Sequence, residues 1–80
     1  MSPVDALPQL TEILRDVLDL PDLVVTSEST ADDVPGWDSM AHITIVVEAE
    51  QRFSVKFRTS EIEALHNVGD FAALIAARTS

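Results

Sequence analysis

The chain has no cysteine and no tyrosine, and its 80 residues include only one tryptophan and three phenylalanines. The absence of cysteine excludes a disulfide framework, a thiolate metal site and a cysteine nucleophile, so any thiol chemistry must come from an attached group. With few aromatic residues, aliphatic side chains must form most of the core. Because 46% of the residues are hydrophobic, we expect one small core and a single domain over residues 1–80.

Basic residues are also scarce, with five against fourteen acidic residues and a formal net charge of −9. This charge argues against nucleic acids and anionic membranes as partners and favours basic patches on other proteins. No apolar run approaches the roughly 18 residues of a membrane-spanning helix. The first residues have neither the basic region nor the apolar block of a signal peptide. We therefore predict a cytoplasmic protein.

The apolar residues near the start of the chain recur with helical spacing. They are Val4, Leu7, Leu10, Ile13, Leu14, Val17 and Leu18. Ser2 and Pro3 suit a helix start, whereas Pro8 inside the pattern leaves the start open by several residues. The helix should end near residues 18–20, ahead of Pro21.

Residues 21–38 then form a long connection, and connections of this length are often functional. Their apolar residues should attach the connection to the core. We expect Val24 and Val25 to do so, with Leu20 or Leu23 joining them.

A second helix is predicted from Ser39 to Arg52. Its core-facing side comprises His42, Ile45, Val46, Ala49 and Phe53. Met40 and Val47 belong to a different stripe and are expected to stay exposed, while Ile43 lies between the two faces.

The last third of the chain predicts an extended connection and two further helices. Residues 54–58 alternate like a strand without a partner, so their apolar side chains, Val55 and Phe57, should enter the core. Ser60–Glu63 matches a capping box, which predicts a short helix through Leu65 or His66. Asn67 caps a final helix that ends at about Arg78. The predicted fold is an all-α bundle of three main helices plus one short helix, with a long first loop.

The junction between the long connection and the second helix carries the leading functional candidate. Pro35–Gly36 predicts a turn, and Asp38 is a good N-cap for the helix that follows. Ser39 then lies in the first helical turn with its hydroxyl facing solvent. Because helix N-termini favour phosphate, this hydroxyl is well placed to carry an anionic group.

Three segments together resemble the acyl carrier protein family, and the resemblance spans nearly the whole chain. They are Asp38–Met40, the helix end Glu48–Phe53, and Glu61–Phe71 with its Asn-Val-Gly-Asp-Phe sequence. The tripeptide recurs by chance, but its position midway in a small acidic helical chain, with both later segments at suitable distances, is specific. Phe53, Phe57 and Phe71 are expected in the core, where they either pack or border a cavity for an acyl chain.

The resemblance implies that Ser39 is esterified to 4′-phosphopantetheine, donated by coenzyme A through a Mg²⁺-dependent phosphopantetheinyl transferase. The thiol of this arm would hold an acyl group as a thioester, and Asp38 would help to present Ser39. Acyl-processing enzymes with basic patches would dock on the second helix, and the family's docking positions correspond to Met40, Val47, Glu48 and Glu50. The chain itself would be a monomer without catalytic residues or a metal site.

Departures from the family pattern indicate a dedicated biosynthetic pathway, of a fatty-acid or polyketide kind. Met40 replaces the usual leucine, and Ala41 and Thr44 stand where fatty-acid-synthesis members commonly carry acidic residues. A peptidyl or aminoacyl carrier is the alternative within the family, and an unmodified acidic docking module is the alternative outside it. A hydrolase is disfavoured because only His42 and His66 could act as bases and the Gly-x-Ser-x-Gly pattern is absent.

Overall fold

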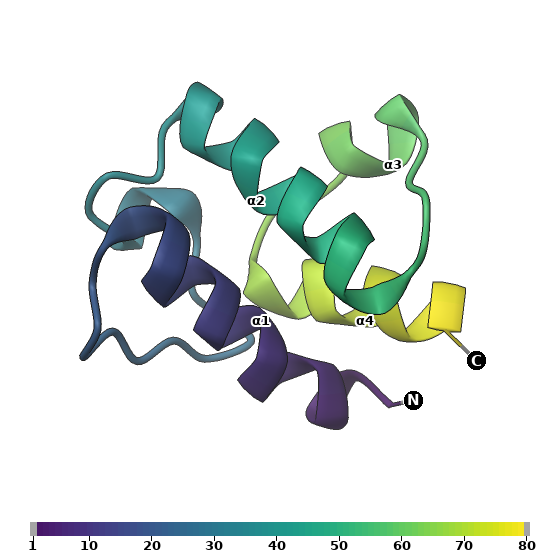
Figure 1. Ribbon diagram of the computed structural model, residues 1–80, viewed down its shortest axis with the longest axis horizontal. Helices are drawn as coiled ribbons and strands as arrows, with labels where there is room; N and C mark the ends of the chain where they lie inside the picture. Colours follow the sequence, from purple (N-terminus) through teal and green to yellow (C-terminus); the bar gives the residue numbers. More distant parts are fainter. Residues whose placement is uncertain (1, 80) are drawn as a thin grey trace.

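A computed structural model describes residues 2–79, and within that range it contains helices and no strand. The elements are α1 (Pro3–Leu18), the 3₁₀ helix η1 (Ala31–Asp33), α2 (Ser39–Phe53), α3 (Thr59–Glu63) and α4 (Val68–Thr79). The three long helices contact one another pairwise, and α3 lies on the side of α2 and α4 that is remote from α1 (Figure 1). The predicted all-α bundle of three main helices and one short helix is confirmed.

Helix α1 begins where its first proline predicts. Ser2 is the N-cap and its hydroxyl accepts from the Asp5 amide at 3.4 Å, while Pro3 occupies the first turn. Pro8 does not displace the start of the helix. It has no N–H to donate to the Val4 carbonyl, but both residues are exposed, so water can satisfy that carbonyl. The helix ends at Leu18, and the C-cap Asp19 has a left-handed backbone and donates its N–H to the Arg15 carbonyl.

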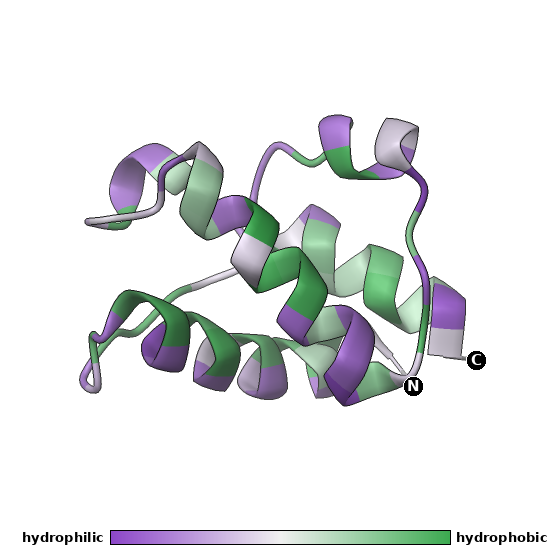
Figure 2. Cartoon of the chain, turned by 45° about the horizontal axis from the view of Figure 1, so that its top comes forward, coloured by the Kyte–Doolittle hydropathy of each residue, from purple (hydrophilic) through white to green (hydrophobic). Residues whose placement is uncertain are grey.

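The core lies where α1, α2 and α4 meet. Its largest fully buried side chains are Phe71, Leu10, Leu14, Ile45, Ile75 and Val68. Figure 2 shows the division on α1, where hydrophobic residues follow one side of the helix and hydrophilic residues the other. On α2, Ile45, Val46 and Ala49 are buried as predicted, whereas His42 and Phe53 are only half-buried.

The long connection is attached to the core by fewer of its predicted residues than expected. Val25 is buried, and Leu20 and Leu23 pack against the core, but Val24 is 79% exposed and its predicted role is wrong. Neighbouring residues of an extended segment point to opposite sides, so Val24 and Val25 cannot both face inward. The connection also contains η1, which the sequence pattern did not reveal, and buried Val34 directly after it.

Helix α3 begins and ends earlier than predicted. Glu61 accepts from the backbone N–H of Arg58 at 2.8 Å, so Arg58 rather than Ser60 is the N-cap, and the helix stops at Glu63 instead of residue 65 or 66. Glu61 also forms an ion pair with Arg78 of α4, and the Arg78 hydrogen bond lowers the pKa of this carboxyl. Glu61 therefore connects the start of α3 with α4.

The start of α4 holds the long connection in place. Asn67 caps the helix as predicted, since its Oδ1 accepts from the Asp70 amide at 2.7 Å. The backbone N–H groups of Val68 and Gly69 donate to the carbonyls of Ser29 and Ser27, both at 2.8 Å. The first turn of α4 therefore uses its free N–H groups to anchor residues of the connection that leads to α2.

Candidate functional site

Ser39 is the first residue of α2, and its side chain is exposed. Asp38 precedes it in an extended conformation, and the Asp38 carboxylate accepts from the Ala41 amide at 2.8 Å. The predicted N-cap is therefore confirmed. It fixes the direction of the first turn of α2 and leaves the Ser39 hydroxyl on the surface.

A tight turn delivers the chain to this cap. Gly36 has a φ of 82°, which a residue with a Cβ rarely adopts, and its carbonyl accepts from the Asp38 amide at 3.0 Å. The Trp37 amide donates to the carbonyl of buried Val34 at 3.3 Å. The turn is thus anchored to the core immediately before Ser39.

The surroundings of Ser39 fit a phosphate ester. Its hydroxyl forms no hydrogen bond with another described residue, so it is free to react. Within residues 2–79, the backbone N–H groups of Ser39 and Met40 also have no partner. Free N–H groups at the positive end of a helix stabilise a nearby phosphate.

Trp37 and His42 form a hydrogen-bonded pair next to this serine. The Trp37 Nε1–H donates to His42 Nδ1 at 3.1 Å, and the two rings stack with centroids 6.0 Å apart. His42 also meets the edge of Phe71, with ring centroids 6.3 Å apart. Burial lowers the pKa of His42 from its ordinary value of 6.5, which favours the neutral imidazole that this hydrogen bond requires.

The lowered pKa of His42 predicts a pH-dependent stability. A histidine whose pKa is lower in the folded than in the unfolded protein contributes its stabilisation above the unfolded value and loses it as the pH falls. We expect the free energy of unfolding to fall as the pH drops below about 6.5, before carboxylates titrate near about 4. Urea denaturation at several pH values measures this. His42→Asn, which keeps an acceptor for Trp37, should remove the decrease in this window, and a decrease of the same size in the variant would assign it to another group.

An open groove of about 840 Å³ lies directly beside Ser39. The start of α2 contributes one wall, and α3 with the residues after it contributes the other. Its lining residues are Ala31, Trp37, Asp38, Ser39, His42, Ile43, Thr59, Ile62, Glu63 and Leu65. The sequence did not predict this groove, because α3 and α2 are brought together only by the tertiary fold.

The four residues predicted to contact partners lie along α2, but not in one environment. Met40 and Val47 are 79% and 42% exposed, as the helical spacing predicted, and Ile43 between them is 65% exposed, so it belongs to the solvent-facing side. Glu48 is also exposed. Glu50 is half-buried, and its carboxylate accepts from the Phe57 amide at 2.9 Å, which gives it a structural role that the sequence did not reveal.

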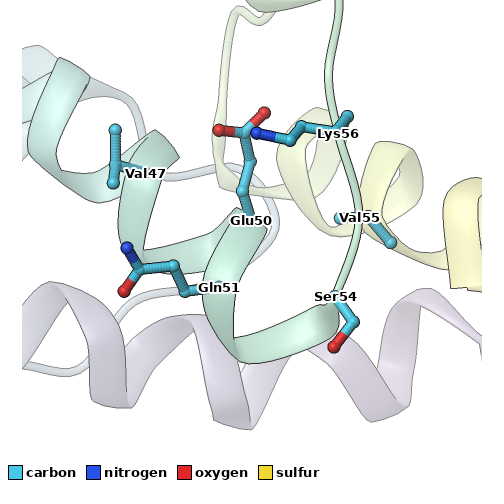
Figure 3. Close-up of a pocket in the computed structure, with 6 residues that line it drawn as sticks. All are labelled: Val47, Glu50, Gln51, Ser54, Val55 and Lys56. Atoms are coloured by element: carbon cyan, nitrogen blue, oxygen red, sulfur yellow. The ribbon is translucent and has the colours of Figure 1, made fainter.

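A second, smaller hollow of about 330 Å³ lies at the far end of α2 (Figure 3). Val47 and Glu50 line it, together with Gln51, Ser54, Val55 and Lys56. In Figure 3 the Glu50 carboxylate and the Lys56 side chain point toward one another. Val47 lies eight residues beyond Ser39, about 12 Å along the helix axis, so this hollow is separate from the groove at the serine.

Two kinds of feature have no candidate among the described residues: a metal-binding cluster and a membrane-spanning helix. Over residues 2–79, no three histidine or acidic side chains come together in a group that could bind a metal ion. In the same range, no helix has the length and apolar character needed to cross a membrane.

Comparison with known proteins agrees with the geometry. Residues 8–75 match the model of the phosphopantetheine attachment site family. An acyl carrier protein of Kineococcus radiotolerans is 38% identical over 73 residues, which cover 90% of this chain and 89% of that protein. The acyl carrier protein MbtL of a Mycobacterium species (strain MCS) is 38% identical over 69 residues, covering 86% of this chain and 78% of that protein.

A solved structure shares the fold. The solution structure of the holo acyl carrier protein from Geobacter metallireducens is 38% identical in sequence and superimposes with a TM-score of 0.86, over 91% of this chain and 84% of that one. The chain therefore belongs to the acyl carrier protein family, and it is a carrier rather than an enzyme, with a covalently attached 4′-phosphopantetheine as its cofactor.

Proposed function

We propose that Ser39 is the residue that bears the 4′-phosphopantetheine arm, with Asp38 presenting it, in a free-standing, monomeric, cytoplasmic acyl carrier protein. The observation that supports this most directly is the exposed, unbonded Ser39 hydroxyl at the N-terminus of α2, beside the groove. A phosphodiester formed there lies against free backbone N–H groups, and the arm leaves the surface next to apolar walls that can receive an acyl chain. The Phe57 and Phe71 rings pack deeper, with centroids 6.0 Å apart.

Other hydroxyls are less suited to carry the arm. The Thr44 hydroxyl donates to the Met40 carbonyl at 3.2 Å, and the Ser29 hydroxyl accepts from the Thr26 amide at 2.9 Å. Ser60 is exposed, but it lies in a helix of five residues. Ser39 combines exposure, a free hydroxyl and the start of a long helix.

Intact mass spectrometry tests this assignment. The protein is incubated with coenzyme A, Mg²⁺ and a broad-specificity phosphopantetheinyl transferase, and it should gain the mass of one phosphopantetheine moiety. Fragmentation of the peptide that carries the added mass should locate it on Ser39. Attachment at any other residue would overturn the assignment.

We further propose that the exposed side of α2 is the docking surface for the transferase and for acyl-processing enzymes with basic patches. Met40 lies next to the arm, Val47 provides an apolar contact two turns away, and Glu48 provides negative charge. Glu50 is the least accessible of the four, so its part in docking should be small while its bond to Phe57 persists.

Val47→Asp tests the docking surface. Val47 is 42% exposed, so a charge there should cost little stability, whereas it should weaken association with an apolar contact on the partner by about tenfold or more. The readout is kcat/KM for transfer of the arm by the phosphopantetheinyl transferase, together with the melting temperature.

Val4→Asp is the matched control, because it makes the same change at an exposed valine on α1. It should leave kcat/KM unchanged. Equal losses in both variants would point to a general charge effect, and a large drop in melting temperature for Val47→Asp would show that Val47 stabilises the fold.

A dedicated pathway, of a fatty-acid or polyketide kind, is the use we propose for this carrier. Ala41 and Thr44 give the first turns of α2 no acidic residue, so the negative charge of the docking surface begins only at Glu48. Apart from the capping Asp38, a partner that recognises acidic residues on the first turns of α2 would find none. One relative has the individual name MbtL in addition to the general name acyl carrier protein, and this supports the proposal of a dedicated pathway. An aminoacyl or peptidyl cargo is the alternative, and direct analysis of the thioester on the purified protein distinguishes the two.

A further inference from the structure

Positive charge is concentrated at one place in this acidic chain. Three of the five basic residues lie within residues 52–58, a segment that contains no acidic residue, and they are Arg52, Lys56 and Arg58. The segment begins in the last turn of α2 and continues along the connection to α3. The far end of α2 therefore carries local positive charge in a protein whose formal net charge is −9.

Lys56 is the cation of this segment that is available to another molecule. Arg52 is already paired with Glu12 at 2.7 Å, and Arg58 is held beside Glu61, which accepts from the Arg58 backbone N–H at 2.8 Å. Lys56 is exposed, and within the described part of the chain its ammonium group forms neither an ion pair nor a hydrogen bond. A partner can therefore pair with Lys56 without breaking a contact inside this protein.

The ammonium group of Lys56 borders the hollow of about 330 Å³ that Val47 also lines (Figure 3). Two further donors line the same hollow, the Gln51 amide and the Ser54 hydroxyl. Neither of these side chains is bonded to another residue in the range 2–79. The hollow therefore continues the docking surface proposed around Val47 with groups that suit a carboxylate.

Glu50 is the acidic residue of this hollow, and it is less available than Lys56. It is half-buried, and its carboxylate accepts from the Phe57 amide at 2.9 Å and points toward Lys56 (Figure 3). A basic residue of a partner would thus meet the exposed ammonium group of Lys56 at this end of α2. Like charges brought together at an interface are strongly disfavoured, so a uniformly basic patch does not fit here.

We propose that Lys56 pairs with an acidic side chain of the cognate phosphopantetheinyl transferase, whose carboxylate enters the hollow beside Val47. This proposal rests on the docking surface proposed for α2. The partner surface that fits carries both signs of charge: it is basic opposite Glu48, apolar opposite Val47 and acidic opposite Lys56. Lys56 then favours this transferase and disfavours enzymes whose docking patch is basic throughout, because specificity is a difference between two affinities.

Zero-length cross-linking tests the contact directly, because Lys56 is the only lysine in the chain. A carbodiimide joins an amine to a carboxylate with loss of water when the two groups are in contact. The protein and its cognate transferase should give a conjugate with one copy of each, and fragmentation should locate the new amide bond between Lys56 and an aspartate or glutamate of the transferase. Coupling of Lys56 to Glu50 of the same chain in place of this conjugate would contradict the proposal.

Lys56→Arg is the control for the chemistry, because arginine keeps the positive charge but does not form this amide bond. It should give no conjugate at position 56, while its kcat/KM for transfer of the arm should equal that of the wild type. A conjugate of the same yield in Lys56→Arg would place the link elsewhere and would overturn the proposal.

Charge reversal tests whether the contact contributes to recognition. Lys56→Glu should lower kcat/KM for the cognate transferase by about tenfold, since it places two negative charges opposite each other. The loss should shrink at high ionic strength, because salt screens exposed charges. Val4→Asp is the control for added negative charge, since Val4 is exposed on α1 and does not line the hollow. It should leave kcat/KM unchanged.

The outcomes separate this proposal from the docking surface on which it rests. If Val47→Asp lowers kcat/KM while Lys56→Glu leaves it unchanged or raises it, the transferase has no acidic group opposite Lys56 and the inference is wrong. If neither variant has an effect, the docking surface itself is wrong. Because Lys56 is exposed, its variants should keep the wild-type melting temperature. If Lys56→Glu does not, Lys56→Gln replaces it, with an expected loss of about threefold in kcat/KM.

Discussion

Ser39→Ala is expected to abolish attachment of the phosphopantetheine arm completely while leaving the fold intact. Ser39 carries the only hydroxyl in the first turn of α2, so the variant offers no hydroxyl there to form the phosphoester. The side chain is exposed and forms no hydrogen bond with another described residue, and alanine is the best helix former. The free energy of unfolding should therefore stay within about 0.5 kcal/mol of the wild-type value.

The measurement combines intact mass after incubation with coenzyme A and transferase with urea denaturation of the same samples. Ser60→Ala is the control, because Ser60 is also an exposed serine in the first turn of a helix. It should gain the full mass of the arm. Continued loading of Ser39→Ala would exclude Ser39 as the attachment residue, and loading of neither the wild type nor Ser60→Ala by its cognate transferase would favour the unmodified docking module.

Gly69→Ala is expected to destabilise the fold more than the same change at Gly36. A Cβ at Gly69 would lie 2.7 Å from the Ser27 carbonyl oxygen and 2.9 Å from the Ser27 Cβ. Both atoms belong to the segment that is bonded to the start of α4, so relief requires the connection to move away and lose its backbone hydrogen bonds. We expect a loss of about 1–3 kcal/mol in the free energy of unfolding, in the range typical of overpacking.

Gly36→Ala provides the comparison at the other glycine. A Cβ there would meet only the Leu18 side chain, at an ordinary contact distance of 3.9 Å, so the cost is that of a left-handed backbone, about 1 kcal/mol. Urea denaturation of both variants gives the two free energies. If Gly69→Ala cost no more than Gly36→Ala, the close approach of the connection to α4 would not be tight in solution.

The sequence predicted most of the fold because the signals that set it are local. The apolar spacing of α1, α2 and α4 and the caps at Ser2, Asp38 and Asn67 all depend on residues within one or two turns of each other. The exposed side of α2 followed from the same periodicity. The exposed hydroxyl at Ser39 was predictable for this reason.

The parts that the sequence did not predict depend on contacts between distant segments. The pattern predicts a capping box of Ser60 with Glu63, yet Glu61 accepts from the amide of the N-cap Arg58 and pairs with Arg78 of α4. Glu50 was assigned to the surface, yet it receives the Phe57 amide. The groove beside Ser39 and the Trp37–His42 hydrogen bond at its side could not be predicted for the same reason, although an aromatic residue five positions before a histidine at a helix start was a signal for their contact.

The position of Trp37 gives the protein a built-in optical reporter. It is the only tryptophan, so all indole emission originates from one ring, and this ring lines the groove beside Ser39. A chain that enters or leaves the groove replaces water at this ring, and protonation of His42 places a cation against its face. The intrinsic fluorescence of the unlabelled protein should therefore register cargo and proton at the same site, which allows loading and unloading to be followed in real time.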